Sequence, residues 1–232
     1  MTKKCVKSMF YMIILVLNLS FVALGGTEIT HSNFQAFYFF QQWLGSYCNQ
    51  KGTPCCYPPQ GKTPPDFTVL GLWPFTADTF PTHCDGVSFD VGALKPIERD
   101  LNAAWPSFTC PQIGRKFWLH EWNKRGTCSK SILDKTAYLQ ASINLKNKVN
   151  LFQVLTKAGI RSDNKFYSLD SIKRAVTNAF GFEPWVSCNQ NVQGNTQLWS
   201  ITLCVDKSGS NLIKCPKIPQ SNCPSSIQFP PY

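Results

Sequence analysis

Histidine is scarce in this chain, and the cysteines lack the spacing of a metal site. Only three histidines occur in 232 residues, at positions 31, 83 and 120. None of the 11 cysteines belongs to a Cys-x-x-Cys pair. Structural zinc sites commonly use such pairs together with nearby histidines. The sequence therefore indicates no metal site, and we expect no cofactor.

Long hydrophobic runs are missing after residue 24. The single apolar run, Met9–Leu24, follows three lysines within the first seven residues and ends at the small pair Gly25-Gly26. This order is typical of a secretory signal peptide. A membrane anchor is disfavoured because a spanning helix needs about 20 apolar residues. We expect residues 1–25 to be cleaved and residues 26–232 to form one domain, a monomer that is secreted or vacuolar and has no membrane association.

Acidic residues are fewer than basic ones, with 13 Asp and Glu against 23 Lys and Arg and a formal net charge of +10. The basic residues are spread along the chain without a dense run, so charge alone favours simple solubility over contact with RNA. The only Asn-x-Ser/Thr acceptor, Asn18-Leu19-Ser20, lies inside the expected signal peptide. The mature chain is therefore expected to carry no N-linked glycan.

Ten cysteines lie beyond the expected signal peptide. An even set in a secreted chain predicts five disulfides, although spacing alone leaves their pairing open. The ten are Cys48, Cys55, Cys56, Cys84, Cys110, Cys128, Cys188, Cys204, Cys215 and Cys223.

Hydrophobic patterning predicts an α+β domain without internal repeats. Strands are expected over Phe37–Trp43, Phe67–Leu72, Trp199–Val205 and Asn211–Cys215. Helices are expected over residues 91–105, 116–125, 135–157 and 169–180, with Asp90 and Ser168 as N-caps and with Gly159 and Gly181 as C-terminal stops.

A group of mainly polar residues lies on the expected helix at residues 116–125. Phe117, His120, Glu121, Lys124 and Arg125 recur at intervals of three and four residues, which places them on one helix face. Taken alone, such a face indicates a solvated surface with salt bridges.

A second segment, Gly71-Leu72-Trp73-Pro74, changes this interpretation. Together the two segments resemble the active-site segments of the T2 family of secreted, base-tolerant ribonucleases, which read His-Gly-Leu-Trp-Pro and His-Glu-Trp-x-Lys-His-Gly-Thr-Cys. In this chain Leu70 stands at the first catalytic histidine position and Arg125 stands at the second.

The resemblance extends over essentially the whole chain beyond the signal peptide. Phe40–Cys48 resembles the first strand of plant T2 enzymes, and Cys55-Cys56-Tyr57-Pro58 resembles the plant ribonucleases called S-like. The family's fold implies a central antiparallel sheet with helices. Its bridge pattern implies Cys48–Cys55, Cys56–Cys110, Cys84–Cys128, Cys188–Cys223 and Cys204–Cys215.

The two replacements remove the proton-transfer chemistry that the resemblance implies. Cleavage of RNA by transphosphorylation takes a proton from the ribose 2′-OH and gives one to the leaving 5′-oxygen, which two imidazoles can do. Leucine has no titratable proton, and arginine stays protonated, so Leu70 and Arg125 cannot replace them. By resemblance, His120, Glu121 and Lys124 are the retained supporting residues of the catalytic site.

Substrate-binding residues are also implied by the resemblance. Trp73 matches an aromatic residue that stacks on a base, and Phe117 and Trp105 lie at positions near the second base site. Core packing is the alternative for each aromatic residue, and we prefer it for Trp105. We hypothesise that Arg125, with Lys124 and His120, binds phosphate or RNA without turnover.

The sequence thus favours a secretory-pathway T2-like protein without ribonuclease activity, serving as a storage (or defence) protein or as an RNA- or phosphate-binding protein. The first alternative is a weakly active endoribonuclease that forms 2′,3′-cyclic phosphates, with His120 or His83 as the replacement catalyst. The second is a self-incompatibility ribonuclease of the pistil, which is disfavoured because that group needs its histidines and commonly carries N-glycans.

Overall fold

The aromatic run near the start of the described chain forms an interior strand of the sheet. The structure is a computed structural model that describes residues 34–57, 65–85, 92–111 and 113–232. All eight residues of β1 (Ala36–Trp43) are buried. β1 pairs antiparallel with β2 (Phe67–Phe75) on one side and with β5 (Thr196–Val205) on the other. Burial on both faces explains why residues 36–40 of this strand are apolar without alternation, although Gln41 and Gln42 are also buried.

Shorter strands complete the sheet on the far side of β5. β4 (Trp185–Gln190) and β6 (Leu212–Ile213) pair antiparallel with β5, and β7 (Ser226–Gln228) pairs antiparallel with β3 (Phe166–Ser168). β7 meets β5 through one parallel pair, Gln197 with Gln228. The α+β fold is confirmed, and the expected antiparallel sheet is mixed at this one contact.

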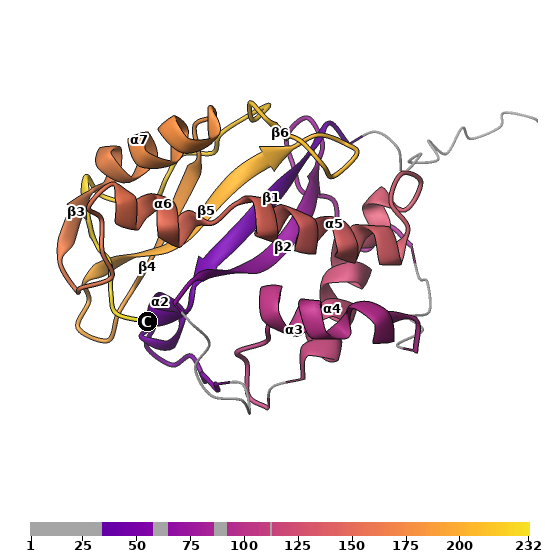
Figure 1. Cartoon of the computed structure of the whole chain (residues 1–232), viewed down its shortest axis with the longest axis horizontal. Coiled ribbons are helices and arrows are strands. Elements are labelled where there is room, and N and C mark those ends of the chain that lie inside the picture. Colours follow the sequence, from indigo (N-terminus) through magenta and orange to yellow (C-terminus); the bar gives the residue numbers. More distant parts are fainter. Residues whose placement is uncertain (1–33, 58–64, 86–91, 112) are drawn as a thin grey trace, which may run out of the picture. The chain divides into compact units, whose positions relative to one another are not determined.

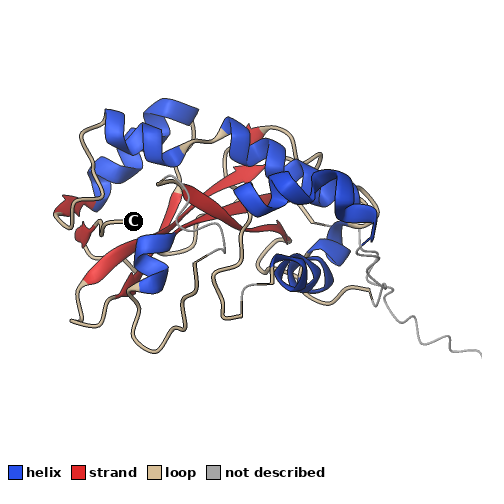
Figure 2. Cartoon of the chain, turned by 60° about the horizontal axis from the view of Figure 1, so that its bottom comes forward, coloured by secondary structure: helices blue, strands red, loops and turns tan. Residues whose placement is uncertain are grey.

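The helices that follow β2 flank the sheet: those within residues 135–180 cover one face, and those within residues 98–124 lie beside β2 (Figures 1 and 2). They are α3 (Glu98–Ala104), α4 (Gly114–Lys124), α5 (Lys135–Lys148), α6 (Leu151–Lys157) and α7 (Leu169–Phe180), and the short α2 (Leu44–Cys48) follows β1. The main core lies between them and the sheet. Within the described segments, no helix combines the length and hydrophobicity needed to cross a membrane.

A smaller apolar cluster occupies the opposite face of the sheet. It consists of Tyr38, Phe40, Phe75, Cys204 and Cys215. Alternate residues of β1 point to opposite faces, so Phe37 and Phe39 enter the main core while their neighbours enter this minor cluster.

Two of the expected helices are divided in the structure. Residues 92–97 form a 3-10 helix that contains Pro96, and the α-helix begins only at Glu98. Proline lacks the backbone N–H that an α-helix interior needs, which accounts for the division. The expected cap Asp90 lies outside the described residues. The expected helix at 135–157 is interrupted at Val149–Asn150, where the Asn150 side chain accepts a 2.8 Å hydrogen bond from the Gln153 N–H and starts α6.

Strand boundaries differ where pairing is set by distant residues. The strand expected over Asn211–Cys215 pairs only at Leu212–Ile213 before Cys215 turns into its disulfide with Cys204. β4 was not expected, because its sequence mixes polar and apolar residues without alternation. The expected signal peptide at residues 1–25 lies outside the described residues.

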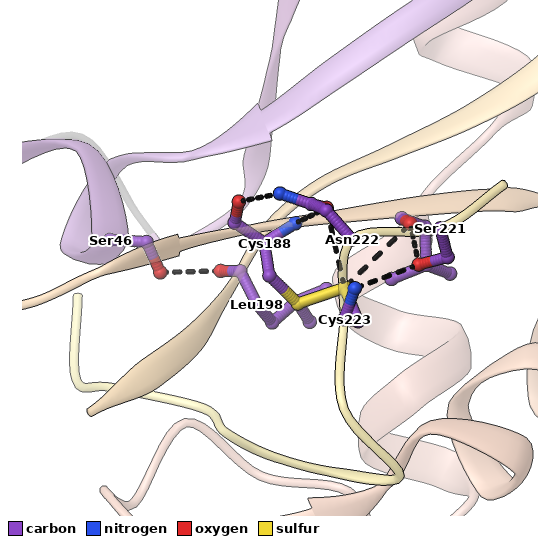
Figure 3. The surroundings of a disulfide bond; sticks show 7 residues. Ser46, Cys188, Leu198, Ser221, Asn222 and Cys223 are labelled. Atoms are coloured by element: carbon purple, nitrogen blue, oxygen red, sulfur yellow. Dashed lines mark hydrogen bonds between the residues drawn. A yellow bond between two sulfur atoms is a disulfide. The ribbon is translucent and has the colours of Figure 1, made fainter. Parts of the chain in front are cut away.

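Five disulfides are present, and they are the pairs that the family resemblance implies. They join Cys48–Cys55, Cys56–Cys110, Cys84–Cys128, Cys188–Cys223 and Cys204–Cys215. Figure 3 shows how Cys188–Cys223 holds the C-terminal segment against β4. Beside it, the Asn222 amide accepts from the Cys188 N–H at 2.9 Å and donates to the Cys188 carbonyl at 2.8 Å, as a neighbouring strand would.

Candidate functional site

A β-bulge in β2 orients Leu70. Phe40 pairs with Gly71 and Gln41 pairs with Val69, so Leu70 is an extra residue opposite β1. A bulge shifts the side-chain alternation by one residue. Val69 enters the main core, and the partly buried Leu70 packs on the minor cluster on the opposite face. Because of the bulge, Leu72 enters the main core and Trp73 points to the same face as Leu70.

Gly71 lets β2 and α4 approach closely. A Cβ atom at this position would lie 2.1 Å from Trp73 Nε1 and 2.8 Å from Glu121 Oε2. In the space left by the missing side chain, Trp73 Nε1 donates a 2.8 Å hydrogen bond to Glu121 Oε2. The Trp73–Glu121 pair therefore joins the two segments that the sequence singled out.

Glu121 is a buried carboxyl with an unusual titration. It is 5% exposed, and burial raises its pKa to about 7. The Trp73 hydrogen bond and the charges of Arg125 and Lys124 act in the opposite direction but do not cancel the effect of burial. Near neutral pH this carboxyl therefore exists in both protonation states.

Arg125 follows the last residue of α4 and contacts a loop from another part of the chain. Its Nη1 donates to the Phe80 carbonyl at 2.7 Å and to the Pro81 carbonyl at 3.2 Å. The guanidinium carbon lies 4.5 Å from the centroid of the Trp73 ring, a cation–π distance. Burial lowers the pKa of Arg125, while the Glu121 carboxylate raises it. Two backbone carbonyls and the Trp73 ring thus hold the guanidinium in place, and Lys124 directly precedes Arg125 in the sequence.

His120 and Lys124 lie one helical turn apart at the exposed end of the site. His120 is exposed, and Lys124 is partly buried. Partial desolvation lowers the pKa of His120, and the charges of Lys124, His83 and Arg125 lower it further. At neutral pH the His120 imidazole is therefore uncharged and can accept a proton.

The loop at residues 80–84 is the part of the site that the sequence motifs did not indicate. The His83 N–H donates to the Lys124 carbonyl at 2.9 Å, and Cys84 is bonded to Cys128. The Phe80 ring packs on Trp73 with centroids 5.7 Å apart. The implied Cys84–Cys128 bridge was the available signal, because it requires this loop to lie near the end of α4.

The aromatic residues expected to bind bases differ in accessibility. Trp105 is fully buried and its carbonyl accepts a 2.7 Å hydrogen bond from Trp118 Nε1, so it is a core residue, as preferred from the sequence. Phe117 is partly buried and meets Trp105 edge-on at 6.3 Å. Trp73 is partly exposed, with Phe40 at 4.2 Å and Arg125 also against its ring.

No group of three or more His, Cys, Asp or Glu side chains in the described parts of the chain is arranged to hold a metal ion. The site brings together Lys124, Arg125 and the imidazoles of His120 and the neighbouring His83, with the Glu121 carboxyl buried close by.

Comparison with known proteins agrees with this arrangement. The family model described as "Ribonuclease T2 family" matches residues 34–215. "Ribonuclease 1" of Arabidopsis thaliana is 47% identical over 203 residues, covering 86% of this chain and 88% of the relative. The crystal structure of RNase NT in complex with 5′-AMP superposes with a TM-score of 0.81 at 40% identity, covering 87% of this chain and 100% of that one.

A more distant relative is named as a storage protein and not as a ribonuclease. The "Ribonuclease-like storage protein" of Panax ginseng is 26% identical over 211 residues, covering 90% of this chain and 87% of the relative. The matched length, the 47% identity and the shared fold lead to one conclusion. The chain belongs to the ribonuclease T2 family.

Proposed function

We propose that this T2-family protein does not turn over RNA and serves in the secretory pathway as a storage protein or as an RNA- or phosphate-binding protein. The observation that carries the proposal is the identity of the residues at the two proton-transfer positions, Leu70 and Arg125. Each positioned acid or base contributes roughly 10²–10⁴-fold to the rate. Loss of both should lower cleavage by several orders of magnitude, although the two losses need not multiply.

The surroundings of both residues support the proposal. Leu70 packs on the minor cluster of mainly apolar and aromatic side chains and has no titratable group of its own. Arg125 has a permanent charge and is held by two carbonyls and an aromatic ring. Neither side chain can carry a proton to or from RNA.

The binding part of the proposal rests on the residues that remain. His120 and Lys124 are accessible at the end of α4, and the Arg125 guanidinium lies beside them. A similar structure was solved with 5′-AMP, which supports nucleotide or phosphate binding by this fold. The name of the Panax ginseng relative supports a storage role. The residue 1–25 pattern supports entry into the secretory pathway, with residues 26–232 as the mature domain.

The deciding experiment is RNA cleavage by the purified mature protein beside the Leu70→His/Arg125→His double variant. We expect the parent to be silent and the double variant to cleave, with a gain of at least about 10²-fold over the parent. Each single variant is the matched control and should gain less, since both transfer groups act in one reaction. Cleavage by the parent at the level of the double variant would refute the proposal.

One observation favours weak endoribonuclease activity as a second candidate. The His120 pKa is depressed, so its imidazole is uncharged at neutral pH and available as a base. Relatives such as "Ribonuclease 1" of Arabidopsis thaliana are named as ribonucleases. Should the parent cleave slowly, loss of that cleavage in His120→Ala would assign the reaction to this imidazole.

A further inference from the structure

His83 is fixed at the C-terminal end of α4 by contacts on both sides. Its own N–H is bonded to the Lys124 carbonyl at 2.9 Å. Upstream, Arg125 Nη1 holds the carbonyls of Phe80 and Pro81, and downstream Cys84 is linked to Cys128. The imidazole is therefore attached to a short segment whose backbone cannot move far from the cationic end of α4.

The backbone of His83 has a left-handed conformation, with φ of 54°. Among residues with a side chain, Asn, Asp and His are the ones enriched in this region. Left-handed backbone is unfavourable for most residues that carry a side chain. The conformation is maintained here because the Lys124 carbonyl, the Arg125 guanidinium and the disulfide fix the loop.

His83 and His120 are both exposed, and the hydrogen bond from the His83 N–H to the Lys124 carbonyl places His83 at the end of α4, one helical turn beyond His120. The charge of His83 contributes to the lowered pKa of His120, as do the charges of Lys124 and Arg125. Lys124, Arg125 and two histidines that can become cationic thus converge at the end of α4 from two separate segments. Such a cluster is costly without an anion, because like charges repel one another, and it is relieved when an anion binds.

We propose that His83 is a fourth member of the anion site with His120, Lys124 and Arg125, and that it binds an RNA phosphodiester in an acid-dependent manner. The inference deepens the proposed function and rests on its RNA-binding part. Lys124 and Arg125 bind the phosphodiester, and the two histidines add charge only when protonated.

The remaining charged groups around this cluster either act in the same direction or are already engaged. Glu121 loses its negative charge as the pH falls through about 7, which also favours an anion. Asp85 is paired with Lys130 at 2.6 Å. The Tyr138 hydroxyl donates to the Leu72 carbonyl, and burial raises its pKa well above the ordinary value, so it stays neutral. A phosphodiester keeps its charge throughout this range, so the pH dependence belongs to the protein.

The test measures binding of a short 2′-O-methyl RNA oligonucleotide without terminal phosphates, which cannot undergo transphosphorylation. Its fluorescence anisotropy is followed from about pH 5 to about pH 7.5, the range in which histidine titrates. A group whose pKa rises by one unit on binding contributes about tenfold to the affinity. We expect the intact protein to lose about 100-fold in affinity over this range and the His83→Asn variant to lose about tenfold. Asparagine accepts the left-handed backbone and so preserves the loop.

Lys157→Gln is the matched control, since it removes an exposed cation at the end of α6, away from this site. It should leave the pH dependence unchanged. An equal pH dependence in His83→Asn and the intact protein, or no binding by the intact protein at about pH 5, would overturn the inference. These outcomes are distinct from cleavage of unmodified RNA by the parent, which would refute the absence of turnover and leave the role of His83 standing.

Discussion

At the scale of single residues, Arg125 requires more of its surroundings than an imidazole at the same position would. A guanidinium carries five N–H donors and a permanent charge, so it must find acceptors when it is partly buried. The structure supplies the carbonyls of Phe80 and Pro81 and the face of Trp73. The same charge compensates Glu121 whenever that carboxyl is ionised. Arg125 therefore has a structural role in addition to any contact with an anion.

The titration of Glu121 predicts a pH-dependent stability. Its pKa is raised from 4.5 to about 7 in the folded protein, so the folded state binds the proton more tightly than the unfolded chain. The resulting stabilisation is complete below the unfolded pKa of 4.5 and is lost as the pH rises through about 7. A shift of this size corresponds to about 3 kcal/mol.

Glu121→Gln removes this titration and keeps an oxygen that can accept from Trp73. We expect the unfolding free energy of the variant, relative to the intact protein, to increase by about 3 kcal/mol between about pH 4 and about pH 8, measured by urea denaturation. A difference between the two proteins that stays constant with pH would show that Glu121 titrates normally in the folded state.

At the scale of elements, the contact between β2 and α4 depends on the absence of a side chain at Gly71. In a Gly71→Ala variant the added methyl would collide with Trp73 Nε1 and Glu121 Oε2, so the hydrogen bond between them must break or the helix must move away. We expect a loss of about 3 kcal/mol in unfolding free energy, from overpacking and a buried carboxyl without its donor. Gly159→Ala is the control.

The control separates packing from backbone strain. Gly159 has φ of 79° and nothing within 4 Å of an added Cβ, so alanine there should cost only about 1–2 kcal/mol of left-handed strain. If Gly71→Ala and Gly159→Ala lost the same unfolding free energy, the close approach of β2 and α4 would add no packing cost at Gly71.

Local sequence predicted the elements that are governed by local chemistry. β1, β2, α4 and α7 lie within a few residues of their expected ranges because periodic apolar residues and stops such as Gly181 define them. β4 and the short β3 and β7 were not expected, because strand pairing and Cys188–Cys223 define them from a distance. The same distinction between local sequence and distant contacts applies to the site. The helix face with His120 and Glu121 was predicted, whereas the approach of the His83 loop depends on contacts with Lys124 and Arg125 from another segment.

At the scale of the whole molecule, two of the disulfides are expected to contribute equally to stability but unequally to the ordering of the site. Cys84–Cys128 closes a loop with a sequence separation of 44, and Cys56–Cys110 closes one of 54. Loop-closure entropy assigns each about 4 kcal/mol of stability. Only the first holds the segment that carries His83 against the end of α4.

Replacing either bridge with a pair of alanines should therefore lower the unfolding free energy by the same amount. The two replacements should differ in their effect on the His83 amide. Both double variants are expected to lose about 4 kcal/mol in urea denaturation. In Cys84→Ala/Cys128→Ala the His83 amide, which is bonded to the Lys124 carbonyl, should lose its protection from hydrogen exchange beyond this global loss. In Cys56→Ala/Cys110→Ala its protection should fall only in proportion to stability. If the two variants protected the His83 amide equally, the Arg125 and Lys124 contacts would suffice to hold the loop, and the Cys84–Cys128 bridge would act only on the unfolded chain.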